Sequence, residues 1–255
     1  MSSNETPSAV PEAAPAGPGS LSRVLGALWS PGRTFASVAA RPAVLVPMLV
    51  LLVFQMVMIG ALYAPVFAPF QKTQMAERMA DLSPDQRAQV ERQQQAMDTP
   101  AGRAIGMVSA LVFGSVFYLL QLVVWAAVLY FVFTLMMSGR AQFKVVLSVA
   151  LYAAAVDIPH FLVLAPLAVA RQDPRVYFGP AALVDAPSPV TFPYILLTRL
   201  DVFSLWAWGL AAVGLALAYK KKSQQVMVAV GAVFVVAAVI TAAIQAATAA
   251  MFHVG

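Results

Sequence analysis

Residues 193–222 read PYILLTRLDVFSLWAWGLAAVGLALAYKKK, a run of mostly apolar side chains that ends in three lysines. A run of this length and composition is typical of a helix that crosses a membrane. It also contains Arg199 and Asp201, and an ionisable side chain within a spanning helix costs about 2.5 to 3.5 kcal/mol on insertion scales. These two side chains therefore need partners or water.

The rest of the chain has the composition of a helical membrane protein. Of its 255 residues, 61% are hydrophobic and 11% are charged, whereas soluble domains carry about 25% charged residues. Long uncharged blocks alternate with short charged ones. We therefore predict an all-α, polytopic bundle of about five transmembrane helices. The predicted spans are at about residues 43–67, 104–138, 145–170, 194–219 and 226–252.

Composition also disfavours several kinds of chemistry. Cysteine is absent, which excludes disulfides and thiolate ligands or nucleophiles, and the two histidines, His160 and His253, disfavour a histidine metal site. The sequence has no Walker loop, dinucleotide fingerprint, Gly-x-Ser-x-Gly or His-Glu-x-x-His motif. We predict no enzymatic activity, no metal and no cofactor. The net charge of +5 comes without a basic stripe interleaved with aromatic residues, so we expect no nucleic-acid partner.

The N-terminal 42 residues divide into two parts. Residues 1–19 are rich in Pro, Ala, Ser and Gly and lack the features of a signal peptide, so we predict a disordered tail and an uncleaved first span. In residues 20–42, apolar side chains recur at helical spacing with Arg23 outside their face, which favours amphipathic interfacial helices over a short soluble helix pair. The apolar face comprises Leu21, Val24, Leu25, Leu28 and Trp29.

The one long polar segment is residues 71–103. In it, Ser83 is followed by Pro84 and, three residues on, by Gln86, the pattern of a helix that starts with a capping box. We predict a polar helical hairpin on the extracytoplasmic side. Residues 104–139 are uncharged and would span roughly 54 Å as one helix, against a hydrocarbon core of about 30 Å. We therefore expect one tilted helix that projects toward the hairpin.

The basic residues of the short connections predict the orientation of the bundle. Arg140 and Lys144 flank one short turn, and residues 220–222 are a lysine triplet in another. With five spans, both turns lie on the same side as the basic residues of segment 20–42. Because short basic loops stay in the cytoplasm, we predict a cytoplasmic N-terminus.

The third span holds Asp157 and His160 beside Pro159, so we expect it to be kinked. Asp157 and His160 are three residues apart and share a helix face, which predicts a hydrogen-bonded pair, and His160 could also reach Asp201. One interpretation is a proton- or ion-coupled transporter or channel site built on Asp157, His160, Arg199 and Asp201. The other, which we favour, is a polar clamp that fixes helix packing.

A third interpretation, an aspartyl protease within the membrane, needs two carboxyl groups that share a proton. At 1.5 Å per residue, Asp157 lies roughly 20 Å and Asp201 roughly 28 Å from the level of Lys144 and Lys220. This offset argues against a shared proton.

Two rows of small or polar residues predict helix packing. In the fourth span, Gly209, Ala212 and Ala216 form a small-residue face for close helix approach, and in the fifth span polar side chains align in the same way. The polar row comprises Thr241, Gln245 and Thr248. Such rows more often join helices than bind a substrate.

Several motifs together resemble the Yip family, relatives of membrane proteins that interact with Rab/Ypt GTPases in eukaryotes. The motifs are WSPGRTF (29–35) with Arg41-Pro42, LSPDQ (82–86), GRAQFK (139–144) and above all LDVFSLW (200–206). The resemblance covers most of residues 28–250. A departure is Asp157-Ile158-Pro159-His160 within the third span.

The resemblance implies a five-span bundle in a bacterial cytoplasmic (inner) membrane, with a cytoplasmic N-terminus and without enzymatic activity. It favours a scaffold or adaptor in membrane organisation or trafficking, and the transporter or channel remains the alternative. The expected partners are the lipid bilayer and a protein bound at the N-terminal helices or at the hairpin, with the oligomeric state left open.

Overall fold

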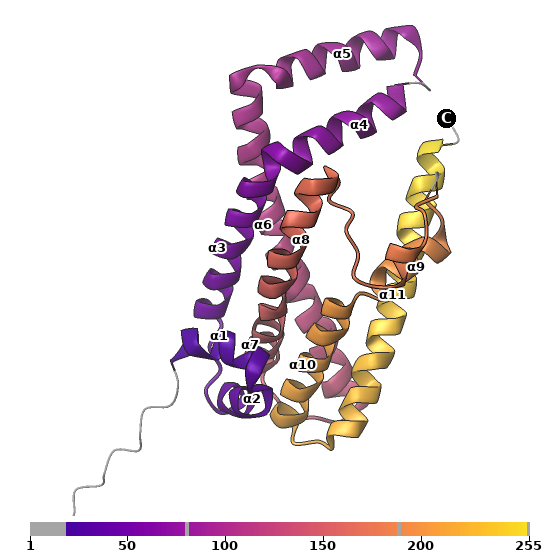
Figure 1. Ribbon diagram of the computed structural model, residues 1–255. Helices are drawn as coiled ribbons and strands as arrows, with labels where there is room; N and C mark the ends of the chain where they lie inside the picture. Colours follow the sequence, from indigo (N-terminus) through magenta and orange to yellow (C-terminus); the bar gives the residue numbers. More distant parts are fainter. Residues whose placement is uncertain (1–18, 80–81, 188–189, 254–255) are drawn as a thin grey trace, which may run out of the picture.

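Every regular element in the described part of the chain is helical, as predicted (Figure 1). The computed structural model describes residues 19–79, 82–187 and 190–253, so all but the last residue of the predicted disordered tail lies outside the described residues. Five described helices are long and apolar enough to cross a membrane, which confirms the expected fold class. They are Leu45–Ala76, Pro100–Met136, Phe143–Arg171, Val202–Tyr219 and Ser223–Ala249.

The N-terminal helices α1 (Ser20–Trp29) and α2 (Pro31–Ala40) pack into one end of the bundle. Phe35 and Val38 have no exposed surface and belong to the main hydrophobic core, together with side chains of the third, fourth and fifth spans. Arg23, which we had placed outside the apolar face, is buried, and its Nη1 donates to the carbonyl of Arg41 at 2.9 Å. This bond accommodates the charge at the end of α2.

The first span continues past the prolines at which we expected it to end. Helix α3 (Leu45–Leu62) runs through a π-helical segment, Tyr63–Phe67, into α4 (Ala68–Met79). Pro65 lies within that segment. Because proline has no N–H to donate, the wider helical turn accommodates it without ending the helix. The helix therefore continues past the predicted span boundary at residue 67, and α4 projects from the bundle (Figure 1).

The polar hairpin is formed by α4 and α5 (Pro84–Asp98), at the opposite end from α1 and α2 (Figure 1). The predicted capping box is present: the Ser83 hydroxyl accepts from the Gln86 N–H, and the Gln86 side chain accepts from the Ser83 N–H. Thr99 then caps α6 (Pro100–Phe131), which ends in a π-helical segment, Val132–Met136. The second span is thus one long helix that reaches the hairpin, as expected.

The third span is interrupted near its middle. Helix α7 (Phe143–Ala153) is followed by a 3-10 turn, Ala154–Val156, and by α8 (Asp157–Arg171). Pro159 cannot donate to the carbonyl four residues earlier, so the regular ladder fails where the sequence predicted a kink. The interruption places Asp157 in the first turn of α8.

The fourth span differs from the prediction because it is not continuous from residue 194. After a 3-10 turn, Pro180–Leu183, come α9 (Phe192–Arg199) and, beyond a break, α10 (Val202–Tyr219). Asp201 is the N-cap of α10, and an N-cap residue has non-helical backbone angles, so the helix cannot run through it. A left-handed Lys220, with φ of 52°, then turns the chain into α11 (Ser223–His253).

Close helix approach occurs at a different glycine from the one we predicted. Ala212 and Ala216 are buried as expected, but a Cβ at Gly209 would meet no atom of the described residues within 4 Å. At Gly214 the same atom would lie 2.5 Å from Val149 Cγ1 and 2.7 Å from Phe35 Cδ1. Gly214 is therefore the residue that lets α2 and α7 approach α10.

In the fifth span, no hydrogen bond of the polar row joins α11 to another helix among the described residues. The hydroxyls of Thr241 and Thr248 donate to carbonyls of α11 itself, and Gln245 is exposed. A hydroxyl that bonds three or four residues back along its own helix is satisfied locally.

The short basic turns lie together at the end of the bundle that carries α1 and α2. A Cβ at Gly139, in the turn before α7, would meet the ring of Tyr219, which ends α10 next to the lysine triplet. Helix α2 contacts both α7 and α10. One end of the molecule thus gathers the basic turns, and the hairpin occupies the other (Figure 1).

Candidate functional site

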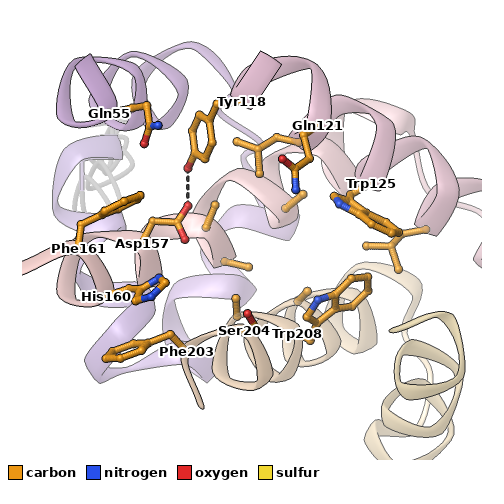
Figure 2. A pocket seen from close by; sticks show the side chains of 17 residues that line it. Gln55, Tyr118, Gln121, Trp125, Asp157, His160, Phe161, Phe203, Ser204 and Trp208 are labelled. Carbon is orange, nitrogen blue, oxygen red and sulfur yellow. Dashed lines mark hydrogen bonds between the residues drawn. The ribbon is translucent and has the colours of Figure 1, made fainter. Parts of the chain in front are cut away.

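Asp157 finds its partner on another span. Its Oδ2 accepts a hydrogen bond of 2.6 Å from the hydroxyl of Tyr118 in α6 (Figure 2). Among the described residues, no hydrogen bond joins Asp157 to His160, so the predicted pair is not formed. The interruption before α8 brings the Asp157 carboxyl group to α6, whereas the His160 imidazole lies among aromatic rings.

His160 is held by aromatic rings. It stacks on Phe203 at the start of α10, with ring centroids 4.7 Å apart and planes at 18°, and on Phe161 at 5.6 Å. Phe178 meets it edge-on at 5.9 Å. The expected contact with Asp201 is replaced by this stacking, which ties α8 to α10 and to the connector.

A cavity of about 340 Å³ lies among α3, α6, α7, α8 and α10 (Figure 2). Its polar lining comes from Gln55, Tyr118, Gln121, Asp157, His160 and Ser204, and its aromatic lining includes Trp125, Trp208, Phe161 and Phe203. Two of these rings, Trp125 and Trp208, meet edge to face at 5.3 Å. Asp157 and its partner Tyr118 therefore both line a recess of the membrane domain.

Asp201 lies outside this cavity and holds the chain together at the start of α10. Its Oδ1 accepts from the N–H groups of Phe203, at 2.9 Å, and Ser204, at 3.4 Å, as an N-cap does. Its Oδ2 accepts from the N–H of Phe178 at 2.8 Å, and Val202 returns a backbone bond to the Phe178 carbonyl at 3.1 Å. One buried carboxylate thus joins the connector to the fourth span.

Gly179 makes this junction possible. A Cβ at this position would collide with the carbonyl oxygen of Leu200. The absence of a side chain lets residues 178–179 lie directly against residues 200–202. The two acids that suggested a protease, Asp157 and Asp201, are therefore engaged separately, one by a phenol and the other by backbone N–H groups.

Arg199 ends α9, and its Nε is buried without a hydrogen-bond partner among the described residues. It is not part of the cavity lining. Of the four residues we had grouped as a polar site, the structure brings Asp157 and His160 to one cavity and assigns Asp201 to a junction.

In the connector, Asp173 and Arg175 form a compact ion pair. Three contacts of 2.7 to 3.1 Å join the Arg175 guanidinium to the carboxylate, and the Arg175 N–H adds a fourth at 2.8 Å. Partial burial opposes ionisation of Asp173, but these hydrogen bonds outweigh it and hold its pKa below the usual range. Arg175 also lies over the ring of Phe70, 4.9 Å from its centroid, which links the connector to α4.

Sequence reasoning missed Tyr118, Gln121 and Gln55 as members of the site. A signal was present: Tyr118 and Gln121 are three residues apart, share a face of α6 and interrupt an otherwise apolar run. Polar side chains at such depth usually face the interior of a bundle. Among the described residues, no group of three His, Asp or Glu side chains is placed to hold a metal.

The motifs around this junction agree with a family comparison. The Yip1 domain matches residues 25–244, which is most of the chain. The chain belongs to the Yip1 domain family. Proteins of the Yip1 domain family are generally non-enzymatic membrane proteins. The LDVFSLW motif has a structural explanation within the Yip1 domain. It contains Asp201, which caps α10 and accepts a hydrogen bond from the Phe178 N–H, and Phe203, whose ring stacks on His160. Comparisons with curated proteins and with solved structures found no match.

Proposed function

We propose that this chain is a non-enzymatic scaffold or adaptor in membrane organisation or trafficking, which binds a protein partner through α4 and α5, here called the arm. The observation that carries the proposal is that α5 contains no buried residue. A helix that is polar on all sides gains nothing from the core of its own bundle. Its fixed, projecting position therefore favours a role outside that bundle.

The arm is held at several points despite its exposure. The capping box at Ser83 starts α5, and Thr99 closes the corner to α6. Lys72 of α4 pairs with Asp98 at the end of α5, with 2.5 Å between the charged groups. Exposed ion pairs contribute little stability, but together with two capped corners this pair limits the orientations open to α5.

The N-terminal helices are less suited to a partner. Phe35 and Val38 are fully buried in the bundle, so most of the apolar surface of α2 is already covered. Helix α1 exposes Leu21, Leu25 and Trp29. Apolar side chains on a helix at the end of a membrane bundle suit the lipid interface.

We also propose the membrane and the orientation: a bacterial cytoplasmic membrane, with the N-terminus in the cytoplasm and the arm on the opposite side. The gathering of both basic turns and Arg33 at the end that carries α1 and α2 supports this orientation, because basic short loops stay in the cytoplasm. The arm then meets partners outside the cytoplasm.

The test uses a photo-crosslinking amino acid in the full chain within native membranes. At Gln93 and Gln95, which are exposed on α5, we expect one and the same protein adduct. At Phe113, which is 73% exposed on the lipid-facing side of α6, we expect none. Replacing residues 82–99 by a short Gly-Ser linker should remove the adduct and change the distribution of that partner in the membrane.

The same replacement provides the control for folding. Because α5 buries no residue, thermal unfolding of the spans should change little when it is removed. Protein adducts from Trp29 in α1 and none from α5 would contradict the arm as the binding element. An unchanged distribution of the crosslinked partner without the arm would contradict the scaffold function.

A further inference from the structure

We propose that the cavity beside Asp157 binds the positively charged head of an amphiphilic amine that enters from the lipid bilayer. The site is separate from the arm, and it is formed by α3, α6, α7, α8 and α10 (Figure 2). Three observations lead to this ligand class: the charge of the lining, its aromatic rings and the position of its opening.

The charge of the cavity lining favours a cationic ligand. Among the described residues that line the cavity, Asp157 is the one carboxyl group, and none is a lysine or an arginine. Its Oδ2 is engaged by Tyr118, while no described residue donates to its Oδ1. The described ion pairs, Lys72 with Asp98 and Arg175 with Asp173, lie elsewhere. A carboxylate inside a membrane needs a counter-charge, and an ammonium group supplies both that charge and donors for Oδ1.

The aromatic lining favours the same ligand. Trp125, Trp208 and Phe203 form part of the wall, and the faces of aromatic rings attract cations, those of tryptophan most strongly. An anion would meet both the carboxylate and the negative faces of these rings. Among the described lining residues, His160 is the one side chain that can carry a positive charge, and its ring is already stacked on Phe161 and on Phe203.

The opening of the cavity faces lipid. Gln121 lines the cavity and is also exposed. On α6 it is surrounded by the exposed apolar side chains of Phe117, Leu120 and Val124. At 1.5 Å per residue, Gln121 is about 22 Å from the Met136 end of the span, and Asp157 is about 21 Å from Phe143. Both lie within a hydrocarbon core of about 30 Å.

Size and access together set the form of the ligand. A volume of about 340 Å³ is near the lower limit for ligand pockets, so it suits an ammonium head and the first part of a single chain. A molecule that reaches Gln121 through the bilayer must dissolve in lipid. A single-chain amine meets both conditions, with its head at Asp157 and its chain passing Gln121 into the membrane.

The experiment uses the full chain in phosphatidylcholine nanodiscs and a dodecylamine that carries a diazirine on the third carbon from the nitrogen, so that the amine stays basic. We expect mass spectrometry to find labelled residues in the cavity lining, such as Phe161 and Trp208. Unmodified dodecylamine should compete for labelling, whereas dodecanol and dodecyl sulfate should not. Ethylamine at the same concentration should not compete either, because it lacks the chain that brings the head to this depth.

Asp157→Asn removes the charge and keeps an oxygen that can accept from Tyr118. Labelling of the cavity should fall about tenfold or more, as for the loss of one member of a desolvated charge pair. Asp173→Asn is the matched control, since this carboxylate is paired with Arg175 outside the cavity, and it should label like the unmodified chain.

Three results would overturn the proposal. They are equal labelling of Asp157→Asn and the unmodified chain, competition by dodecanol as strong as that by dodecylamine, and competition by ethylamine as strong as that by dodecylamine. The second and third results need no variant, so the proposal stays testable if Asp157→Asn does not fold.

Discussion

Asp201 shows how one side chain serves two segments at once. Its Oδ1 caps α10, and its Oδ2 holds the N–H of Phe178 in the connector. The position at the start of an 18-residue helix, about 27 Å long, puts the carboxylate near the edge of the hydrocarbon core. Burial is tolerated there because three backbone N–H groups replace water as donors.

The two functions of Asp201 can be separated by substitution. Asp201→Asn keeps an oxygen for the cap but loses the second acceptor, so we expect faster hydrogen exchange at the Phe178 amide. Asp201→Ala loses both, and we expect it to destabilise the fold by about 1 to 2 kcal/mol through the cap alone. Hydrogen-exchange mass spectrometry and unfolding in detergent measure these effects. Asp185→Asn, at an exposed position, is the control. Unchanged exchange at Phe178 in Asp201→Asn would contradict the hydrogen bond between Asp201 and the Phe178 N–H as a stabilising contact.

At the scale of elements, two features shape the bundle: the positions at which helices are interrupted and the positions at which they pack closely. Pro65 is accommodated by a π-helical segment, whereas Pro159 follows a 3-10 turn that directs Asp157 toward α6. Contact is set by Gly214, where α10 presents bare backbone to Val149 and Phe35. The interruption before α8 therefore orients Asp157 toward α6, and Gly214 determines how closely α2 packs against α10.

The docking of α2 can be tested with two substitutions in the same helix. In Gly214→Val the added atoms meet Val149 and Phe35, so we expect overpacking that destabilises the fold by about 1 to 3 kcal/mol. Gly209→Val adds the same atoms where no atom in the described part of the chain lies within 4 Å of the Cβ, and should leave stability nearly unchanged. Thermal unfolding of the purified variants measures the difference. Equal stabilities would show that α2 does not depend on this close approach.

At the scale of the whole molecule, the features that could be predicted from the sequence are those that depend on residues close together in the chain. The spans follow from local hydropathy, and the capping box at Ser83 from four consecutive residues. The break at Asp201 was missed because apolar residues continue on both sides of it. The bond between Tyr118 and Asp157 joins two spans across 39 positions, and helical periodicity contains no information on which spans become neighbours.

The distribution of basic residues over the whole molecule predicts its orientation, and the absence of cysteine makes the test simple. Single cysteines at Lys221, in the turn after α10, and at Gln93, on the arm, should label on opposite sides of the membrane. Because basic short loops are retained in the cytoplasm, a membrane-impermeant maleimide added to intact cells should react with Gln93→Cys. It should react with Lys221→Cys only after the membrane is permeabilised. Labelling of Lys221→Cys in intact cells, with protection of Gln93→Cys, would reverse the orientation and place the arm in the cytoplasm.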